Sequence, residues 1–89
     1  MIELKLGGAM KNVPFTDIST EQWRTYIFPE EHLPDGRIKP ETWVTINTPA
    51  YLNVSPSGGH RILDRAGVSH YIPCGWKHLY WLAEPHFVN

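Results

Sequence analysis

Residues 60–72 have the sequence HRILDRAGVSHYI, and this stretch predicts a β-hairpin. Two five-residue segments flank Arg65-Ala66-Gly67, which is typical of a type I turn closed by a glycine in the left-handed conformation. The turn also sets the register of the two strands. It predicts the pairs Asp64 with Val68, Ile62 with His70, and His60 with Ile72.

The strand pattern continues along most of the chain. Alternation of side chains predicts strands in MIELKL (1–6), TWVTIN (42–47), AYLNVS (50–55) and WKHLYWL (76–82). Pro49 separates the second of these segments from the third. Between the first and the second, PEEHLPDGRIKPE (29–41) contains three prolines and Asp35-Gly36, which predicts an exposed turn region.

One segment near the N-terminus, DISTEQWRTY (17–26), predicts a short helix. Ser19 suits the N-cap, and Gln22 follows it at the spacing of a capping box. Pro29 stops any continuation. We therefore expect an α+β, mainly β fold: a small antiparallel β-roll or barrel of SH3-like or OB-like size, with one short N-terminal helix. At 89 residues the chain forms a single small domain, residues 1–89.

The first ten residues have two interpretations. KLGGAM (5–10) can be encoded by codons that contain a bacterial ribosome-binding sequence just before Met10. Residues 1–9 would then be an upstream extension, with the native start at Met10. The alternative is that MIELKL is a strand of the folded domain, and we favour the strand.

Composition and charge argue against several classes of protein. Eight basic and nine acidic residues give a formal net charge of −1, which implies no strong attraction to nucleic acid or to an anionic membrane. The single cysteine excludes an internal disulfide. No apolar run approaches the roughly 18–20 residues that cross a bilayer, and the N-terminus lacks the features of a signal peptide. We therefore expect a cytoplasmic protein.

The histidines and the cysteine raise the question of a metal or catalytic site. His70, Cys74 and His78 are spaced four residues apart, but the proline and glycine that flank the cysteine exclude a helix that would place all three on one face. On the predicted hairpin His60 and His70 are diagonal neighbours, whereas Cys74 lies in the following loop. A lone cysteine is more often a small buried side chain than a nucleophile. We expect no enzymatic activity, no bound metal and no cofactor.

A glycine-rich loop is a candidate binding site for an anion. The loop SPSGGHR, Ser55–Arg61, can present backbone N–H groups as an anion-binding nest does. The residues that would contact the anion are Ser57, Gly58, Gly59, His60 and Arg61. The loop lacks the phosphate-loop motif and no helix follows it, so the alternative is a flexible connection between strands.

Aromatic and acidic residues supply candidate contact surfaces for a protein partner. Tyr80 and Trp81 are adjacent on a predicted strand, so their side chains point to opposite faces and cannot enter the same core. An aromatic on the solvent side is typical of a binding hot spot, unless another segment such as the C-terminal tail covers it. The candidate partner-binding residues are Glu30, Glu31, Asp35, Arg61, Tyr71, Trp76, Tyr80 and Trp81.

These features favour a non-enzymatic protein-binding module. The short, near-neutral, aromatic-rich chain, and the codons by which KLGGAM can be encoded, suggest a bacterial or bacteriophage accessory protein, which binds and inhibits or modulates a host protein or defence complex. Anti-CRISPR proteins offer an analogy of class only. The first alternative is a module that binds a nucleotide or nucleic acid through Ser55–Arg61 and nearby aromatics. The second is a structural or virion subunit that assembles as a homo-oligomer through an exposed strand edge.

Overall fold

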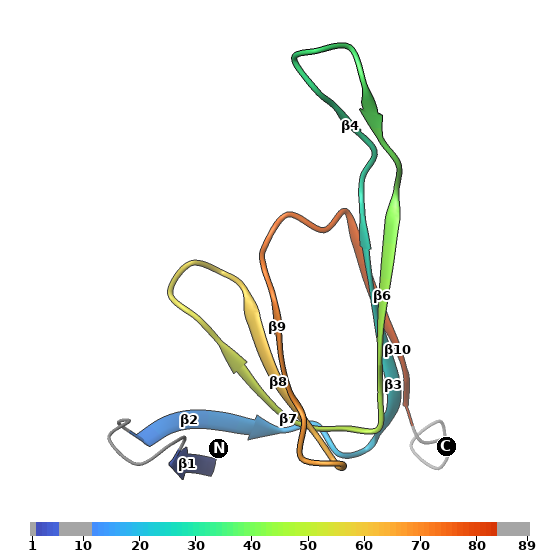
Figure 1. Ribbon diagram of the computed structural model, residues 1–89. Coiled ribbons are helices and arrows are strands. Elements are labelled where there is room, and N and C mark those ends of the chain that lie inside the picture. The colour runs from blue at the N-terminus through green and yellow to red at the C-terminus, as the bar shows by residue number, and fades with distance from the viewer. Residues whose placement is uncertain (1, 6–11, 84–89) are drawn as a thin grey trace.

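The computed structural model describes residues 2–5 and 12–83, and every regular element in them is a β-strand (Figure 1). The strands are β1 (Ile2–Lys5), β2 (Asn12–Asp17), β3 (Glu21–Phe28), β4 (Glu31–His32), β5 (Ile38–Lys39), β6 (Thr42–Asn47), β7 (Pro49–Val54), β8 (His60–Asp64), β9 (Ser69–Ile72) and β10 (His78–Ala83). The strand predicted in MIELKL is confirmed as β1, whereas Met10 lies outside the described residues. No helix of the length and apolarity needed to cross a bilayer occurs in this part of the chain.

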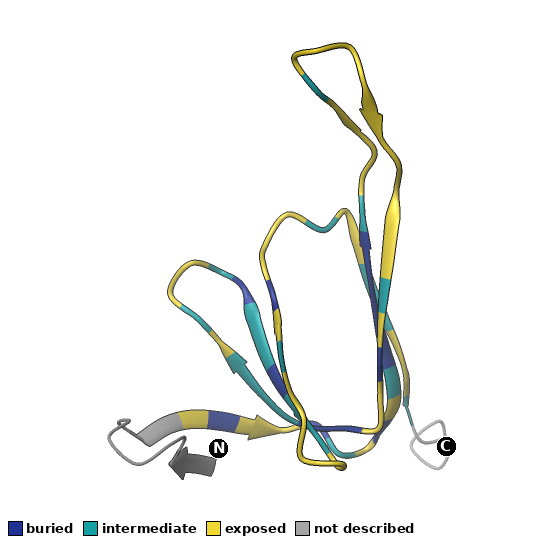
Figure 2. Cartoon of the chain, in the orientation of Figure 1, coloured by how far each residue is buried: buried dark blue, intermediate teal, exposed yellow. Residues whose placement is uncertain are grey.

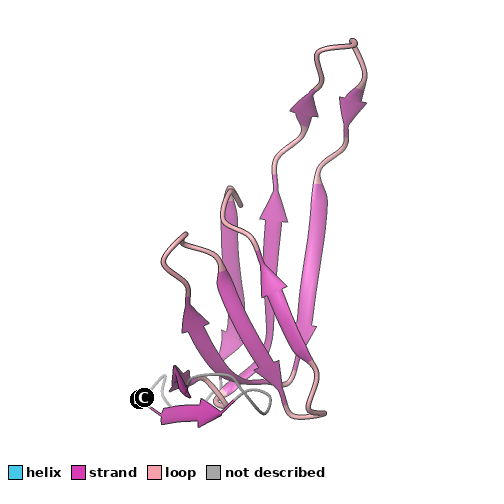
Figure 3. Cartoon of the chain, turned by 60° about the vertical axis from the view of Figure 1, so that its left-hand side comes forward, coloured by secondary structure: helices cyan, strands magenta, loops and turns pink. Residues whose placement is uncertain are grey.

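Antiparallel pairing organises the strands into three sheets. A five-stranded sheet has the order β1-β2-β7-β8-β9, a three-stranded sheet has the order β10-β3-β6, and β4 pairs with β5. The two larger sheets diverge like the walls of a V, and the chain crosses between them at the closed end, from β2 to β3 and from β6 to β7 (Figure 1 and Figure 3). The prediction of a small, mainly β, antiparallel fold is confirmed. The sheets formed by residues 2–5 and 12–83 are open, so these strands do not close into a barrel.

The helix predicted over residues 17–26 is wrong. Asp17 caps a local turn, because its Oδ1 accepts the backbone N–H of Ser19 at 2.8 Å and the N–H of Glu21 donates to the carbonyl of Ile18 at 3.0 Å. Strand β3 begins directly after this turn and is the central strand of its sheet, bonded to β10 on one side and β6 on the other. Its aromatic and β-branched residues favour a pleated strand, and pairing on both sides outweighs a weak local helix signal.

Thr48 marks the point where the chain passes from one large sheet to the other. Its φ of 48° is the one positive value found at a non-glycine residue of the described chain, and Pro49 follows it as the first residue of β7. The N–H of Thr48 donates to the carbonyl of Gln22 at 2.9 Å, and its carbonyl accepts the N–H of Arg65 at 3.0 Å. The proline that was expected to break a strand therefore starts the next one, after a sharp bend.

The hydrophobic core fills the closed part of the V. Its buried centre consists of Tyr26 and Ile46 from the three-stranded sheet and Ile62 and Ile72 from the five-stranded sheet. Partly buried residues surround this centre, namely Phe28, Val44, Leu52, Trp76 and Leu79. Figure 2 shows buried segments near the junction of the two sheets and mostly exposed segments toward the open end. The core of a chain this short is small, so a few large side chains carry much of the stability.

The hairpin predicted at residues 60–72 is confirmed, including its register. The strands pair as expected, with Ile62 opposite His70, and Gly67 closes the turn with a φ of 87°. The N–H of Asp64 donates to the carbonyl of Val68 at 3.0 Å. The Asp64 side chain stabilises the turn as well, since its Oδ1 accepts two backbone N–H groups and its Oδ2 lies 2.8 Å from His70 Nε2.

The exposed turn region predicted at residues 29–41 is confirmed as a hairpin, here called the arm, which extends β3 and β6 away from the core (Figure 1). At its tip Gly36 has a φ of 89°. Every residue of the arm is exposed except Leu33, which is half-buried. The molecule is accordingly extended: its radius of gyration is 15.3 Å, against about 12 Å for a compact domain of this length.

Candidate functional site

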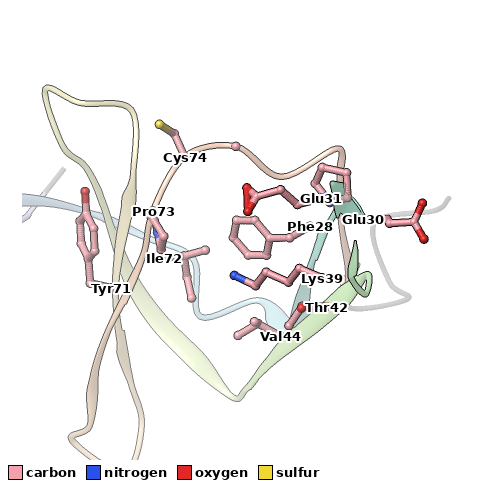
Figure 4. A pocket seen from close by; sticks show the side chains of 12 residues that line it. Phe28, Glu30, Glu31, Lys39, Thr42, Val44, Tyr71, Ile72, Pro73 and Cys74 are labelled. Atoms are coloured by element: carbon pink, nitrogen blue, oxygen red, sulfur yellow. The ribbon is translucent and has the colours of Figure 1, made fainter. Parts of the chain in front are cut away.

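A groove of about 510 Å³ opens between the base of the arm and the loop that follows β9. We call it the mouth groove. Phe28, Val44 and Ile72 form an apolar floor that continues the hydrophobic core (Figure 4). Pockets that receive a ligand or the side chains of a partner have volumes of this order and mostly apolar linings. The mouth groove therefore has the size and the apolar lining of a binding site.

Opposite charges meet at the arm side of the mouth groove. Glu31 and Lys39 are directly paired in the β4–β5 ladder, and both line the groove. Figure 4 shows the two side chains directed into the space between the walls, whereas Glu30 points away from it. Glu30 Oε2 instead lies 3.3 Å from Nε2 of His32. Of the two predicted contact residues Glu30 and Glu31, the structure thus directs only Glu31 into the groove.

The far wall of the mouth groove is the loop from Pro73 to Lys77. Trp76 anchors this loop to the core, with its ring centroid 5.0 Å from that of Tyr26 and 4.7 Å from that of His60. The N–H of Lys77 donates to the carbonyl of Ile27 at 2.8 Å, and its ammonium group pairs with Glu41. These contacts attach the loop to β3 and to the base of the arm. Trp76 therefore packs beneath the loop, against the core, and does not line the groove.

The acidic residues of the arm do not form one negative patch. Asp35 at the tip pairs with Arg37 (Oδ2 to Nε, 2.6 Å), and Glu41 at the base pairs with Lys77. Each acid of the arm thus has a basic residue or a histidine as its neighbour. These pairs are exposed and contribute little to stability, but they leave little net charge to attract a basic partner. A partner that recognises the arm by acidity alone is not favoured by this arrangement.

A buried polar network lies behind the groove floor. Glu21 and Arg24 form a bidentate ion pair with distances of 2.6 and 2.8 Å, and both side chains are at least nine-tenths buried. Arg24 Nη1 donates to the Tyr26 hydroxyl at 3.3 Å, and that hydroxyl lies 2.7 Å from Nδ1 of His60. The guanidinium also lies over the ring of Trp81, 4.8 Å from its centroid. Every buried polar group of the network has a partner, as stability requires.

Burial in the network shifts the pKa values of His60 and Tyr26. Burial, reinforced by the positive charge of Arg24, lowers the pKa of His60 below its usual value. Burial also raises the pKa of the Tyr26 hydroxyl. A neutral His60 accepts a hydrogen bond at Nδ1, and a protonated Tyr26 donates it, so both shifts agree with the observed contact. The arrangement connects the two sheets and does not present a nucleophile to solvent.

The glycine-rich loop predicted to bind an anion is closed upon itself. The N–H of Ser55 donates to the carbonyl of Gly59, and the N–H of Gly58 donates to the carbonyl of Ser55, both at 2.9 Å. The hydroxyl of Tyr71 lies 3.2 Å from Ser55 Oγ and 3.0 Å from Ser57 Oγ. A Cβ added at Gly59 would come 2.3 Å from that hydroxyl, so the loop needs a glycine for this contact. Tyr71 is therefore a clamp on the loop.

The two basic residues of the predicted anion site point in different directions. His60 is held inside the V by Tyr26, whereas Arg61, as the next residue of a strand, faces the other side of the sheet. Arg61 Nη1 lies 3.4 Å from the side-chain oxygen of Asn53. The structure does not bring these residues together with the loop amides. Binding of a nucleotide there stays a prediction, with less geometric support than the mouth groove has.

Sequence reasoning missed the outer face of the three-stranded sheet. Ladder pairing places three rows of side chains there: Trp43, Ile27 and His78; Thr45, Thr25 and Tyr80; Asn47, Trp23 and Leu82. No Asp, Glu, Lys or Arg occurs among them, although one face of an antiparallel sheet is usually polar. Trp43 is 59% exposed. Alternation in TWVTIN predicted a strand there, but the helix expected over residues 17–26 hid the neighbouring strand β3 and with it this face.

The predicted contact aromatics do not form one surface. Tyr80 lies on the outer face of the three-stranded sheet, where its ring meets that of Trp23 edge-on at 5.4 Å. Trp81 lies on the opposite face of β10, toward Arg24. Tyr71 belongs to the other sheet. Tyr80 and Trp81 point to opposite faces of β10 as expected, but the four predicted contact aromatics do not gather in a single patch.

The histidines and the cysteine are dispersed. In residues 2–5 and 12–83, no three His, Cys, Asp or Glu side chains are placed to hold one metal ion. His70 pairs with Asp64, His60 with Tyr26, and Cys74 is exposed at the lip of the mouth groove. Comparisons of this chain with protein-family models, with curated proteins and with solved structures returned no significant match.

Proposed function

We propose that this chain is a non-enzymatic protein-binding module, and that the mouth groove receives an extended segment of a partner protein. The observation that carries the proposal is the groove itself, with Phe28, Val44 and Ile72 on its floor and a Glu31–Lys39 pair at its rim. An apolar side chain of the partner desolvates the floor, and a charged neighbour of that side chain meets one of the two rim groups.

The arm supports the same proposal. A two-stranded hairpin that projects alone is marginally stable in water, and Ile38 on this one is 52% exposed. A partner segment seated in the groove contacts the base of the arm and restricts its movement relative to the core. The partner segment then lies between the arm and the 73–77 loop, and Trp76 anchors the loop to the core.

We further propose that the module is an accessory protein of bacterial or bacteriophage origin, acting in the cytoplasm, which inhibits or modulates the protein it binds. Size and near-neutral charge support this role, and the likeness to anti-CRISPR proteins is one of class. We also propose that the fold is a partly open roll of SH3-like size, in which β2 and β3 form one long bent strand and β6 and β7 form another.

Affinity capture from bacterial lysate after nuclease treatment tests the proposal. The informative pair of variants is Lys39→Glu at the groove and Arg37→Glu at the tip of the same arm, because both make the same change of charge. We expect wild type and Arg37→Glu to retain one dominant protein that Lys39→Glu loses, while thermal melts show all three folded. Equal capture by both variants, or a complex that nuclease removes, would contradict the proposal.

A further inference from the structure

We propose that the outer edge of β6 pairs with the same edge of a second copy of this chain, joining two three-stranded sheets into one sheet of six strands. This inference goes beyond the proposed function, because it uses backbone groups at a sheet edge and not the mouth groove. It assigns a chemical partner, a second copy, to a surface that the partner-binding role leaves free.

The edge of β6 is the one least protected against pairing. In the described residues no strand bonds to its outer side, and its register with β3 is regular over six consecutive pairs. Its sequence, TWVTIN, contains no charge and no proline. The other edges carry the usual protections: β1 contains Glu3 and Lys5, β9 has four residues, and β10 has an irregularity between Leu82 and Ala83.

The backbone groups available on this edge follow from the ladder. The N–H of Thr48 donates to the carbonyl of Gln22, so this pair is hydrogen-bonded, and bonded pairs alternate along an antiparallel ladder. Val44 and Ile46 therefore bond inward to β3. The N–H and C=O groups of Trp43 and Thr45 point outward, away from β3. The backbone groups of Asn47 point the same way, and its carbonyl accepts the hydroxyl of Thr48 at 2.8 Å. Trp43 and Thr45 alone supply two donors and two acceptors in a regular row.

A two-fold axis through Val44 satisfies the outward groups of Trp43 and Thr45. Trp43 of one copy then lies opposite Thr45 of the other, and the two residues exchange hydrogen bonds in both directions. The same pairing sets the indole of Trp43, 59% exposed in the single chain, against the side chain of Thr45 across the new ladder. Antiparallel pairing of identical strands is self-complementary, so the contact closes as a dimer and does not propagate.

The exposed area of the single chain is larger than a monomer of its mass presents. The accessible surface is 6170 Å², whereas a compact 10.2 kDa monomer exposes roughly 5,300 Å². The excess, roughly 850 Å², reflects the exposed arm and the open sheets, which leave strand edges such as that of β6 uncovered in the described residues. A formal charge of −1 per chain opposes self-association only weakly. Electrostatic repulsion between two copies is therefore weak.

Light scattering on a sizing column, over a series of concentrations, tests the dimer with the Thr45→Pro variant. Proline at this position removes an outward N–H and leaves the ladder to β3 intact. Thr45→Val is the matched control, because it loses the same hydroxyl contact to Thr25 (2.9 Å) but keeps the backbone N–H. We expect wild type and Thr45→Val to approach twice the 10.2 kDa chain mass as concentration rises, and Thr45→Pro to stay at that mass.

A charge pair keeps the proposal testable if Thr45→Pro fails to fold. The two residues at position 45 are diagonal neighbours across the proposed axis, so like charges there repel. Thr45→Lys and Thr45→Glu should each be monomeric, and their equimolar mixture should regain the dimer mass. A wild type that stays monomeric up to its solubility limit would overturn the proposal, and so would a folded Thr45→Pro that dimerises as wild type does.

Discussion

The buried Glu21–Arg24 pair gives the sharpest prediction of stability. Glu21→Gln removes the carboxylate that accepts two hydrogen bonds from Arg24, and both side chains are about 95% buried (exposed fractions of 6% and 5%). The variant leaves a charged guanidinium in the interior without its counter-charge: the amide oxygen of the new glutamine replaces one of the two carboxylate acceptors, and the Tyr26 hydroxyl stays a partner. Breaking such a pair on one side costs about 3–5 kcal/mol. A domain of this length has roughly 5–13 kcal/mol in total, so the loss is a large share.

Urea unfolding followed by tryptophan fluorescence measures the effect, since the denaturation midpoint moves in proportion to the free energy lost. The double variant Glu21→Leu with Arg24→Met should recover most of that loss, because a buried ion pair and an apolar pair of similar volume are close in stability. Asp35→Asn, which breaks an exposed pair at the arm tip, should leave the midpoint nearly unchanged. A Glu21→Gln midpoint as high as that of Asp35→Asn would refute the reasoning.

Three further effects follow from the same contacts. Gly59→Ala should lower the urea midpoint by forcing the Tyr71 hydroxyl to move, with a cost of about 1–3 kcal/mol, and Tyr71→Ala in the same chain should relieve it. Because the pKa of His60 is lowered by burial and by Arg24, the folded chain binds fewer protons there than the unfolded chain does; its contribution is present above about pH 6.5 and decreases as the pH falls through the folded pKa. Midpoints measured between pH 7 and 5 should therefore fall more steeply for wild type than for His60→Gln. Ile62→Ala, at a fully buried position, should cost about 2–5 kcal/mol, whereas Val68→Ala at the exposed turn should cost under about 0.5 kcal/mol by the same unfolding assay.

Short sequence motifs were enough to predict those elements whose structure depends on contacts between neighbouring residues. The hairpin around Gly67 was predicted to the residue, because its turn chemistry fixes the register without help from the rest of the chain. The exposed arm was predicted from its prolines and from Asp35-Gly36 in the same way. Short-range geometry of this kind is readable from a few consecutive residues.

The failures come from contacts between distant segments. The helix expected over residues 17–26 was overruled by β6 and β10, which pair with β3 from far along the chain. The mouth groove combines Phe28 and Lys39 with the loop after β9, and no local pattern joins those segments. The clamp of Tyr71 on Ser55 and Ser57 also depends on pairing across strands, so the sequence left the loop as either a candidate anion nest or a flexible connection.

The difference between local and long-range contacts also explains which of the predicted contact residues lie at the surface and which do not. Alternation separated Tyr80 from Trp81 correctly, but it does not say which face another element covers. Trp76 was expected at a surface and instead packs on Tyr26 and His60, because the loop that carries it turns back over the core. Only the position of a side chain relative to a second sheet separates a core aromatic from a contact aromatic.

The exposed thiol of Cys74 allows the most direct test of the mouth groove. It is the only cysteine of the chain, and it lies in the groove wall, so its rate of alkylation reports occupancy of the groove. The measurement compares alkylation of Cys74 with and without the captured partner, and uses Arg37→Cys in a Cys74→Ser background as the control at the arm tip. The mouth-groove proposal predicts that the partner slows alkylation of Cys74 severalfold and leaves the tip cysteine unchanged. Unchanged alkylation of Cys74 in a partner-saturated sample would contradict it.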